Sequence, residues 1–408
     1  MQDKDTTKST FFQVFYPIIA NPQYHQLLEL LEADLYVKKM STTQLIELLA
    51  IAQFKQFPSL RDISNSLHDD QFNRVIDLDS ISASQISRRL RELPPEICRM
   101  LFNAIKLQIG MAMGFGNLTA NVNQLYIIDA STISLCLSRY PWAVFRKTKS
   151  GIKLHLRLKF TKEGAVPDDV IFTPAKQADK TQMDSLVVEE TDALNVFDRG
   201  YVDYNKFDSY CEKGIRFVTR LKGNAVIEVV KESPIQHEIP ITKDCIVYLG
   251  KEGTTKMQHP LRLLETTDAS GKRFIITTND FGLSAEELGD IYRHRWQIEL
   301  FFKWIKQHCH VKHFYGLSFT AVENQLLIAL IAYCLLLLLK LRNGYQGSLL
   351  NIKRIVCNCL CELFNSFLEK LLRRPKHRSR GRQKINHEAM YQKVLLEVMN
   401  GNPDYLMV

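Results

Sequence analysis

The sequence predicts a mixed α/β protein of several domains, with helices at both ends and a strand-rich region between them. Three observations predict this fold class. Helical periodicity runs from Phe11 to Gly110, strand-like alternation of apolar and polar residues begins near Leu125, and a helical pattern returns at Ile291. A chain of 408 residues is also too long for one ordinary domain and long enough to bury a sizeable core.

The composition favours a soluble, basic protein that acts on a polyanion. The formal net charge of +9 favours nucleic acid or an anionic membrane surface as partner. The apolar run Leu326–Leu339 is shorter than the roughly 20 residues that a bilayer helix needs, so we expect a buried core helix and no membrane partner. Met1–Thr10 has no apolar signal segment, and 9 cysteines indicate reduced thiols, so we expect a cytoplasmic protein.

The first region, residues 1–115, reads as short helices. Thr42 or Thr43 is the expected cap of one of them, and the last, Ser84–Leu93, is basic. Such a series resembles a helix-turn-helix module whose last helix would bind DNA. An ordinary helical bundle with a solvated basic face explains the same pattern. The side chains available to bases and phosphates are those of Gln85, Arg88 and Arg89.

The second region, residues 116–223, reads as three strands, a helix, a strand, a helix and a strand. This order is the RNase H-like arrangement. Asp129 ends the first strand (LYIIDAS) and Asp198 ends the fourth (LNVFDRGY). Because these strands would be neighbours in the sheet, the two carboxylates are expected at one edge. Alternatively, each aspartate simply caps a turn.

Residues 224–279 contain four further strand patterns, VIEVV, CIVYLG, LRLLETT and RFIITT, which suggest a small inserted sheet. Residues 280–345 would then complete the core and carry a third acid. Residues 346–408 are expected to form a helical C-terminal region. The predicted fold is therefore an RNase H-like core with an inserted β-rich subdomain between two helical regions.

The segment Ile291–Lys306 (IYRHRWQIELFFKWIK) places one carboxylate among cations on one helix face. At 100° per residue, four side chains fall within about 40° of Glu299, and an apolar seam runs beside them. The alternative is a solvent-exposed helix face that is stabilised by ion pairs between residues four positions apart. The residues of this stripe are Tyr292, Arg295, Glu299, Lys303 and Lys306.

Three converging acids would repel one another unless divalent cations neutralise them. Oxygen ligands select hard cations, so Mg²⁺ is expected, with Mn²⁺ as a substitute. Two such ions about 4 Å apart support in-line phosphoryl displacement.

Two other groups of residues could suggest a metal site. Zinc is the weaker alternative at the cluster His308, Cys309, His310 and His313. Buried helix residues better explain Cys357, Cys359 and Cys361.

Together, Asp129 in IIDAS, Asp198 in VFDRGY, the inserted strands and the spacing of Tyr292, Arg295, Glu299 and Lys306 resemble one enzyme family. This family is the bacterial insertion-sequence transposases of the DDE class that bear the YREK signature. The resemblance covers roughly residues 125–315, and no triad or signature position departs from it.

The resemblance implies a cut-and-paste transposase that acts as a homodimer on double-stranded DNA, at the inverted ends of its element and at a target. Asp129, Asp198 and Glu299 would hold two Mg²⁺ ions for hydrolysis, hairpin formation and joining of 3′ ends. The other stripe residues would hold phosphates near a flipped base. Trp296 and Trp142 are candidates to stack on that base, although packing in the core is the favoured explanation for each.

The segment Arg373–Lys384 contains no acid, which predicts an exposed arm that contacts phosphates, although a solvated linker is the alternative. Its arginines are Arg373, Arg374, Arg378 and Arg380. Two other functions also fit the sequence. One is a catalytically silent DNA-binding protein derived from a transposase, and the other is an RNase H-like nuclease that cuts without joining.

Overall fold

The computed structural model describes residues 7–114, 122–161, 164–234, 241–267 and 273–373, together with the single positions 392, 393 and 396. They fall into two compact units. The helical unit contains the described parts of 7–114, 130–178 and 297–373, and the sheet unit contains those of 122–129 and 179–296. Strand β1 (Gln124–Leu135) begins in the sheet unit and ends in the helical unit.

The helical unit consists mainly of helices, with an antiparallel set of strands. β3 pairs with both β2 and β4 in antiparallel register and is the neighbour of β1. The helices are α1 (Thr10–Ile19), α2 (Pro22–Leu30), α3 (Thr42–Lys55), α4 (Leu60–Ser66), α5 (Asp70–Ile76), α6 (Ala83–Glu92), α7 (Pro95–Met113), α11 (Trp296–His308, from residue 297), α12 (Phe319–Arg342), α13 (Leu349–Cys359) and α14 (Phe364–Leu372). The strands are β2 (Val144–Arg146), β3 (Lys149–Thr161) and β4 (Gly164–Pro174), and the 3₁₀ helix η1 spans Pro141–Ala143.

The N-terminal helices begin at polar caps. Ser41 caps α3, because its hydroxyl accepts from the Gln44 N–H while the Gln44 side chain accepts from the Ser41 N–H. The cap therefore lies just before Thr42, which the sequence had suggested for this role. Ser82 and Gln85 form the same capping box at α6, where a helix was predicted.

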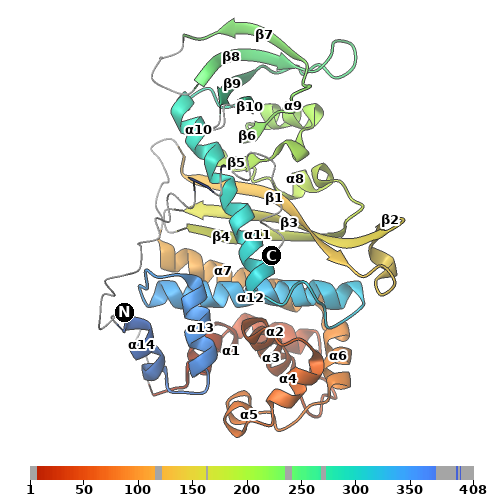
Figure 1. Ribbon diagram of the computed structural model, residues 1–408, viewed down its shortest axis with the longest axis vertical. Coiled ribbons are helices and arrows are strands. Elements are labelled where there is room, and N and C mark those ends of the chain that lie inside the picture. Colours follow the sequence, from red (N-terminus) through yellow and green to blue (C-terminus); the bar gives the residue numbers. More distant parts are fainter. Residues whose placement is uncertain are drawn as a thin grey trace. The chain divides into compact units, whose positions relative to one another are not determined.

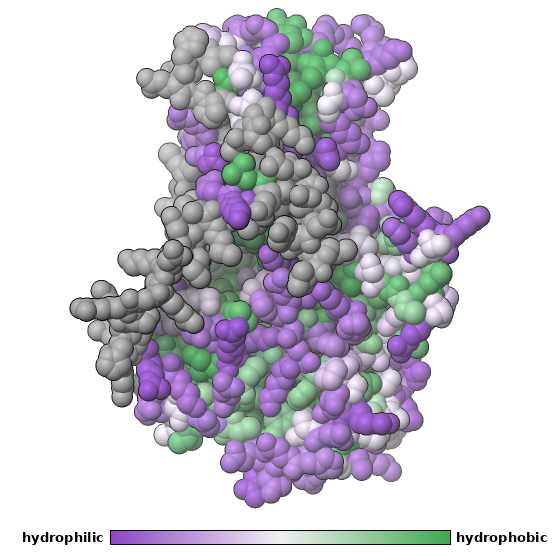
Figure 2. Space-filling view, viewed as in Figure 1, coloured by the Kyte–Doolittle hydropathy of each residue, from purple (hydrophilic) through white to green (hydrophobic). Residues whose placement is uncertain are grey.

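Helix α12 is the centre of the helical unit. It contacts α7, α3, α6 and α13, and Figure 1 shows α7 and α12 running side by side. At 24 residues it is long and apolar enough to cross a membrane, so the short apolar run was the wrong reason to reject a span. Its most apolar window is 89% buried by the surrounding helices, which supports the predicted core helix. The N-terminal helices themselves present mainly hydrophilic side chains in Figure 2.

The sheet unit is built on strands in the order β1-β5-β6-β10-β9-β8-β7. β1, β5 and β6 are parallel, whereas β10 pairs antiparallel with β6. The elements are η2 (Asp179–Gln182), α8 (Met183–Leu186), β5 (Ala193–Phe197), η3 (Arg199–Tyr201), α9 (Tyr204–Lys213), β6 (Arg216–Arg220), β7 (Ile227–Glu232), β8 (Ile241–Leu249), β9 (Leu261–Thr267), β10 (Arg273–Thr278) and α10 (Ala285–His294).

The strands β7 to β10 lie where the sequence predicted four strands, but they do not form a separate sheet. Thr278 is opposite Val218 and Ile276 is opposite Arg220, so β10 continues the core sheet directly from β6. Figure 1 shows β7 at the far end of this series. Pairing with β6 satisfies backbone groups that would otherwise form an open edge.

Aromatic packing and one buried amide hold the core of the sheet unit. The rings of Phe207 on α9 and Phe217 on β6 are stacked with centroids 4.7 Å apart, and Phe197 on β5 packs 5.8 Å from Phe217. The Asn195 amide is fully buried and donates to the carbonyls of Val188 and Arg216. The end of β5, where Asp198 follows, is thereby fixed against its neighbours.

The segment predicted as one helix, Ile291–Lys306, is divided in the structure. α10 ends at His294 and α11 begins at Trp296. Arg295 between them keeps right-handed helical backbone angles, and its N–H bonds to the Tyr292 carbonyl, three residues back. The predicted apolar seam is nevertheless buried, at Ile291, Ile298, Phe302 and Ile305.

Candidate active site

Two aspartates follow the paired parts of two adjacent parallel strands of the sheet unit. Strand β1 pairs with β5 so that Ile128 is opposite Phe197, and the next residues are Asp129 and Asp198. The two strands are neighbours, as the sequence predicts, and Asp198 directly follows β5. Asp129 does not end its strand as predicted, because β1 continues to Leu135. The residues directly before the two aspartates are buried.

Tyr292 and Arg295 reach these two carboxylates. The Tyr292 hydroxyl donates to Asp198 Oδ1 at 3.5 Å, and Arg295 Nη1 lies 3.9 Å from Asp129 Oδ2. The Arg295 guanidinium also lies 5.8 Å from the Tyr292 ring. Burial is the main cause that raises the pKa of Tyr292 to about 12, with Arg295 opposing and Asp198 adding to the shift, so the phenol remains a neutral donor.

Further cationic and aromatic side chains extend this group, and sequence reasoning missed them. The Arg220 guanidinium lies 5.3 Å from the Phe274 ring, and the Phe274 ring lies 6.4 Å from that of Tyr292. Arg220 is on β6 and Phe274 on β10, so only the pairing of those strands brings them together. No local pattern in the sequence signals this contact.

Tyr201 is a second residue that sequence reasoning missed. It lies in η3 directly after Asp198, is 1% exposed, and is close enough to Asp129, Asp179 and Asp198 for their charges to raise its pKa beyond the effect of burial. Its position at the end of the DRGY motif was the available signal.

In the helical unit, α11 carries the rest of the predicted stripe. Lys306 Nζ donates to Ser131 Oγ at 2.7 Å and to the Thr132 carbonyl at 3.1 Å. Burial and the nearby Lys312 lower the pKa of Lys306. Ser131 and Thr132 lie in the part of β1 that belongs to the helical unit. Glu299 is partly buried and Lys303 is exposed.

No group of three or more His, Cys, Asp or Glu side chains arranged to hold a metal ion occurs among the described residues. The structure thus gives an aspartate pair rather than a completed three-acid cluster, and the same finding leaves the zinc alternative without support in this part of the chain. His310 instead stacks on Tyr315 with centroids 5.0 Å apart. An all-carboxylate donor pair suits a hard cation such as Mg²⁺.

Residues 121–335, more than half of the chain, match the model described as "Transposase DDE domain". The chain belongs to this DDE transposase family. A family of this kind consists of enzymes that cut and join DNA, and the aspartate pair lies inside the matched range.

Curated relatives of this transposase agree with the assignment. A Geobacillus stearothermophilus protein named as a transposase for an insertion sequence element is 28% identical over 72% of this chain and 75% of its own length. A Sinorhizobium fredii protein named as a transposase is 32% identical over 58% of this chain and 67% of its own length. The chain is thus a bacterial insertion-sequence transposase of the DDE type.

A comparison with solved structures gave a piggyBac transposase synaptic complex with hairpin DNA. It has a TM-score of 0.47 and 12% identity, and covers 95% of this chain and 84% of that chain. A second family model, described as a domain of unknown function (DUF4372), matches residues 7–73, which carry α1 to α5.

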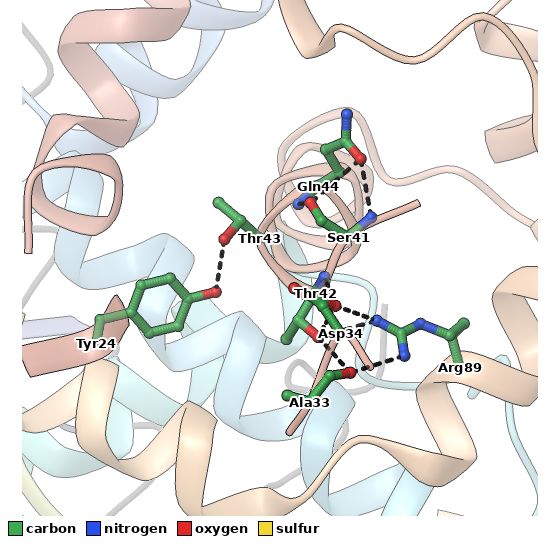
Figure 3. A network of polar contacts seen from close by, with 8 residues as sticks. All are labelled: Tyr24, Ala33, Asp34, Ser41, Thr42, Thr43, Gln44 and Arg89. Carbon is green, nitrogen blue, oxygen red and sulfur yellow. Dashed lines mark hydrogen bonds and ion pairs between the residues drawn. The ribbon is translucent and has the colours of Figure 1, made fainter. Parts of the chain in front are cut away.

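Helix α6 lies beyond that second match and holds the transposase residues expected to contact bases. Arg88 is exposed, whereas Arg89 is directed into the protein (Figure 3). The Arg89 guanidinium donates to Asp34 Oδ1 at 2.8 Å, to Thr42 Oγ1 at 2.9 Å and to the Ala33 carbonyl at 3.2 Å. These intramolecular hydrogen bonds explain the position of the Arg89 side chain without a contact to DNA.

We expect Arg89→Ala to lower the free energy of unfolding of the transposase by about 1.5–3 kcal/mol, because charge-assisted bonds to partly buried groups are lost. Arg88→Ala is the matched control and should leave stability unchanged. Urea unfolding followed by circular dichroism measures both. Equal stability of the two variants would contradict a structural role for Arg89.

The predicted C-terminal arm lies mostly outside the described residues. Arg373 follows the end of α14, and Arg374, Arg378 and Arg380 are not described. Trp142, a candidate for base stacking, instead donates its indole N–H to the Leu317 carbonyl at 2.7 Å and packs edge-on against Phe319.

Proposed function

We propose that this transposase cuts an insertion sequence at its inverted ends and joins the freed 3′ ends to target DNA, with Asp129, Asp198 and Glu299 as catalytic residues. The observation that carries the proposal is the aspartate pair that directly follows the paired residues Ile128 and Phe197 of the parallel strands β1 and β5. In the strand order, β1 lies between β3 and β5, and this order supports an RNase H-like core.

Mg²⁺ fits this donor set, because carboxylate oxygens are the ligands that it prefers. Asp129 and Asp198 would hold it, with Glu299 as the third ligand. When bound, a pair of such ions activates a water or a 3′-hydroxyl and stabilises the leaving oxygen.

Lys306 supports the inclusion of Glu299. The two residues are seven positions apart on α11, so they share a helix face about 10 Å apart. Because Lys306 is bonded to Ser131 and Thr132, that face is directed toward the part of β1 that belongs to the helical unit. The YREK signature is therefore proposed as a functional unit.

Arg295 and Tyr292 are proposed to bind phosphates of the transposon end. The guanidinium presents a planar set of donors that suits a phosphate, and its Nη1 lies 3.9 Å from Asp129 Oδ2, beside the proposed metal site. The neutral Tyr292 hydroxyl orients Asp198, and Lys303 and Lys306 add positive charge along α11.

The remaining parts of the proposal concern assembly. A hairpin intermediate, a homodimer on double-stranded DNA and a cytoplasmic location are proposed from the family resemblance. Gln85 and Arg88 on α6 and the basic arm from Arg373 onward are proposed to contact DNA outside the catalytic core.

A strand-transfer assay tests the function. Labelled double-stranded DNA that carries the element's end is incubated with the protein, a supercoiled plasmid and Mg²⁺. The proposed transposase joins the labelled 3′ end to the plasmid. A nuclease would release fragments without joining them, and a silent DNA-binding protein would shift the DNA without cutting it.

A further inference from the structure

The phenol of Tyr201 lies in an unusual environment for a buried hydroxyl. Its backbone N–H donates to the Asp198 carbonyl at 3.0 Å, which closes the η3 turn and places its ring 6.2 Å from that of Phe197. The side chain is 1% exposed, and its hydroxyl has no hydrogen-bond partner within the part of the chain that the structure describes. The residues after Asp198 therefore bury an unpartnered hydroxyl in the sheet unit.

A buried hydroxyl that has lost water and found no replacement destabilises the fold. Phenylalanine would pack the same ring without this penalty, so packing alone does not explain a tyrosine here. Three carboxylates lie close enough to the phenol to interact with it electrostatically, those of Asp129, Asp179 and Asp198. Beside ionised carboxylates, a neutral hydroxyl can only donate.

We propose that Tyr201 is a positioning residue of the cation site, and that its hydroxyl donates to a carboxylate oxygen of Asp129 or Asp198 when these residues bind a divalent cation. The inference rests on the proposed function, because it assumes that the aspartate pair binds the cation. Residues that orient metal-binding carboxylates in this way commonly change metal affinity by about 10- to 100-fold.

The test is Mn²⁺ binding by the full-length chain without DNA, followed by electron paramagnetic resonance of the free ion. Tyr201→Phe should weaken binding about 10-fold or more. Its melting temperature in metal-free buffer should be unchanged or higher, because only an unpaired hydroxyl is removed. Unchanged Mn²⁺ affinity would overturn the inference.

Tyr210→Phe is the matched control. Tyr210 is also a buried tyrosine of the sheet unit, but its hydroxyl donates to Asp184 Oδ1 at 2.6 Å. This variant should melt at a lower temperature and bind Mn²⁺ with unchanged affinity. A purely structural Tyr201 would give the same result as Tyr210.

Aspartate variants separate this inference from the proposed function. Asp129→Asn and Asp198→Asn should both lose Mn²⁺ binding. If they bind like the wild type, the proposed metal site itself is wrong. If they lose binding while Tyr201→Phe keeps it, only the role of Tyr201 fails. In the cleavage assay, Tyr201→Phe should raise the Mn²⁺ concentration for half-maximal rate more than it lowers kcat.

Discussion

Asp129→Asn and Asp198→Asn should each reduce Mg²⁺-dependent cleavage of end DNA by about 10³-fold or more, which corresponds to about 4 kcal/mol of transition-state stabilisation. The amide keeps the size and hydrogen-bonding capacity of the side chain but removes the negative charge that a hard cation requires. Binding of end DNA should be largely retained, because phosphate contacts come from cationic residues. Cleavage on a denaturing gel and a mobility shift measure the two properties.

Asp290→Asn provides the control for these variants. Asp290 is an aspartate of the same unit, on α10, and is 64% exposed where it pairs with Arg293. We expect cleavage at the wild-type rate, since exposed pairs of this kind contribute little. A wild-type rate for Asp129→Asn or Asp198→Asn would remove that residue from the active site.

Glu47 should make the helical unit less stable as the pH rises. It lies on α3, is 4% exposed, and burial raises its pKa from 4.5 to about 8. The folded state therefore keeps the proton up to about pH 8, whereas the unfolded state releases it near 4.5. Stability is greatest below the unfolded pKa and falls between these two values, because the folded state must ionise a desolvated carboxyl.

The full loss is on the order of 4–5 kcal/mol at 1.36 kcal/mol per pKa unit. Glu47→Gln removes the ionisation, so at pH 8.5 this variant should melt on the order of 10 °C above the wild type, and near pH 5 the difference should be small. Scanning calorimetry from pH 5 to 9 measures both proteins. Glu29→Gln, at an exposed site on α2, should follow the wild type. Parallel pH profiles for the wild type and Glu47→Gln would contradict the buried ionisation.

The local patterns of the sequence were good guides to element type. The alternation in GIKLHLRLKF gave β3, the apolar seam of Ile298 and Ile305 was buried, and the DRGY turn followed β5. These features depend on neighbours along the chain, which propensity and periodicity report directly. The interruption between α10 and α11 was missed, because it involves a single residue, Arg295, whose N–H bonds to the Tyr292 carbonyl three positions back.

Partners distant in sequence could not be predicted. Arg89 was expected to contact DNA, yet Asp34 and Thr42, far from it along the chain, bind its guanidinium. The contact between Arg220 and Phe274 likewise follows from the pairing of β6 with β10. The direction in which a side chain points depends on what the rest of the chain packs against it.

The sequence by itself determined the class of this protein, because the spacing of an acid and its cations on a helix and the aspartates after apolar strands are properties of the linear chain. Only the tertiary structure decided which side chains touch those aspartates, that strands β7 to β10 extend the core sheet, and that Tyr201 is buried beside three carboxylates. The physical reason is that burial and hydrogen-bond partners depend on packing between residues that are distant in sequence, and such contacts produce no periodic pattern in the sequence.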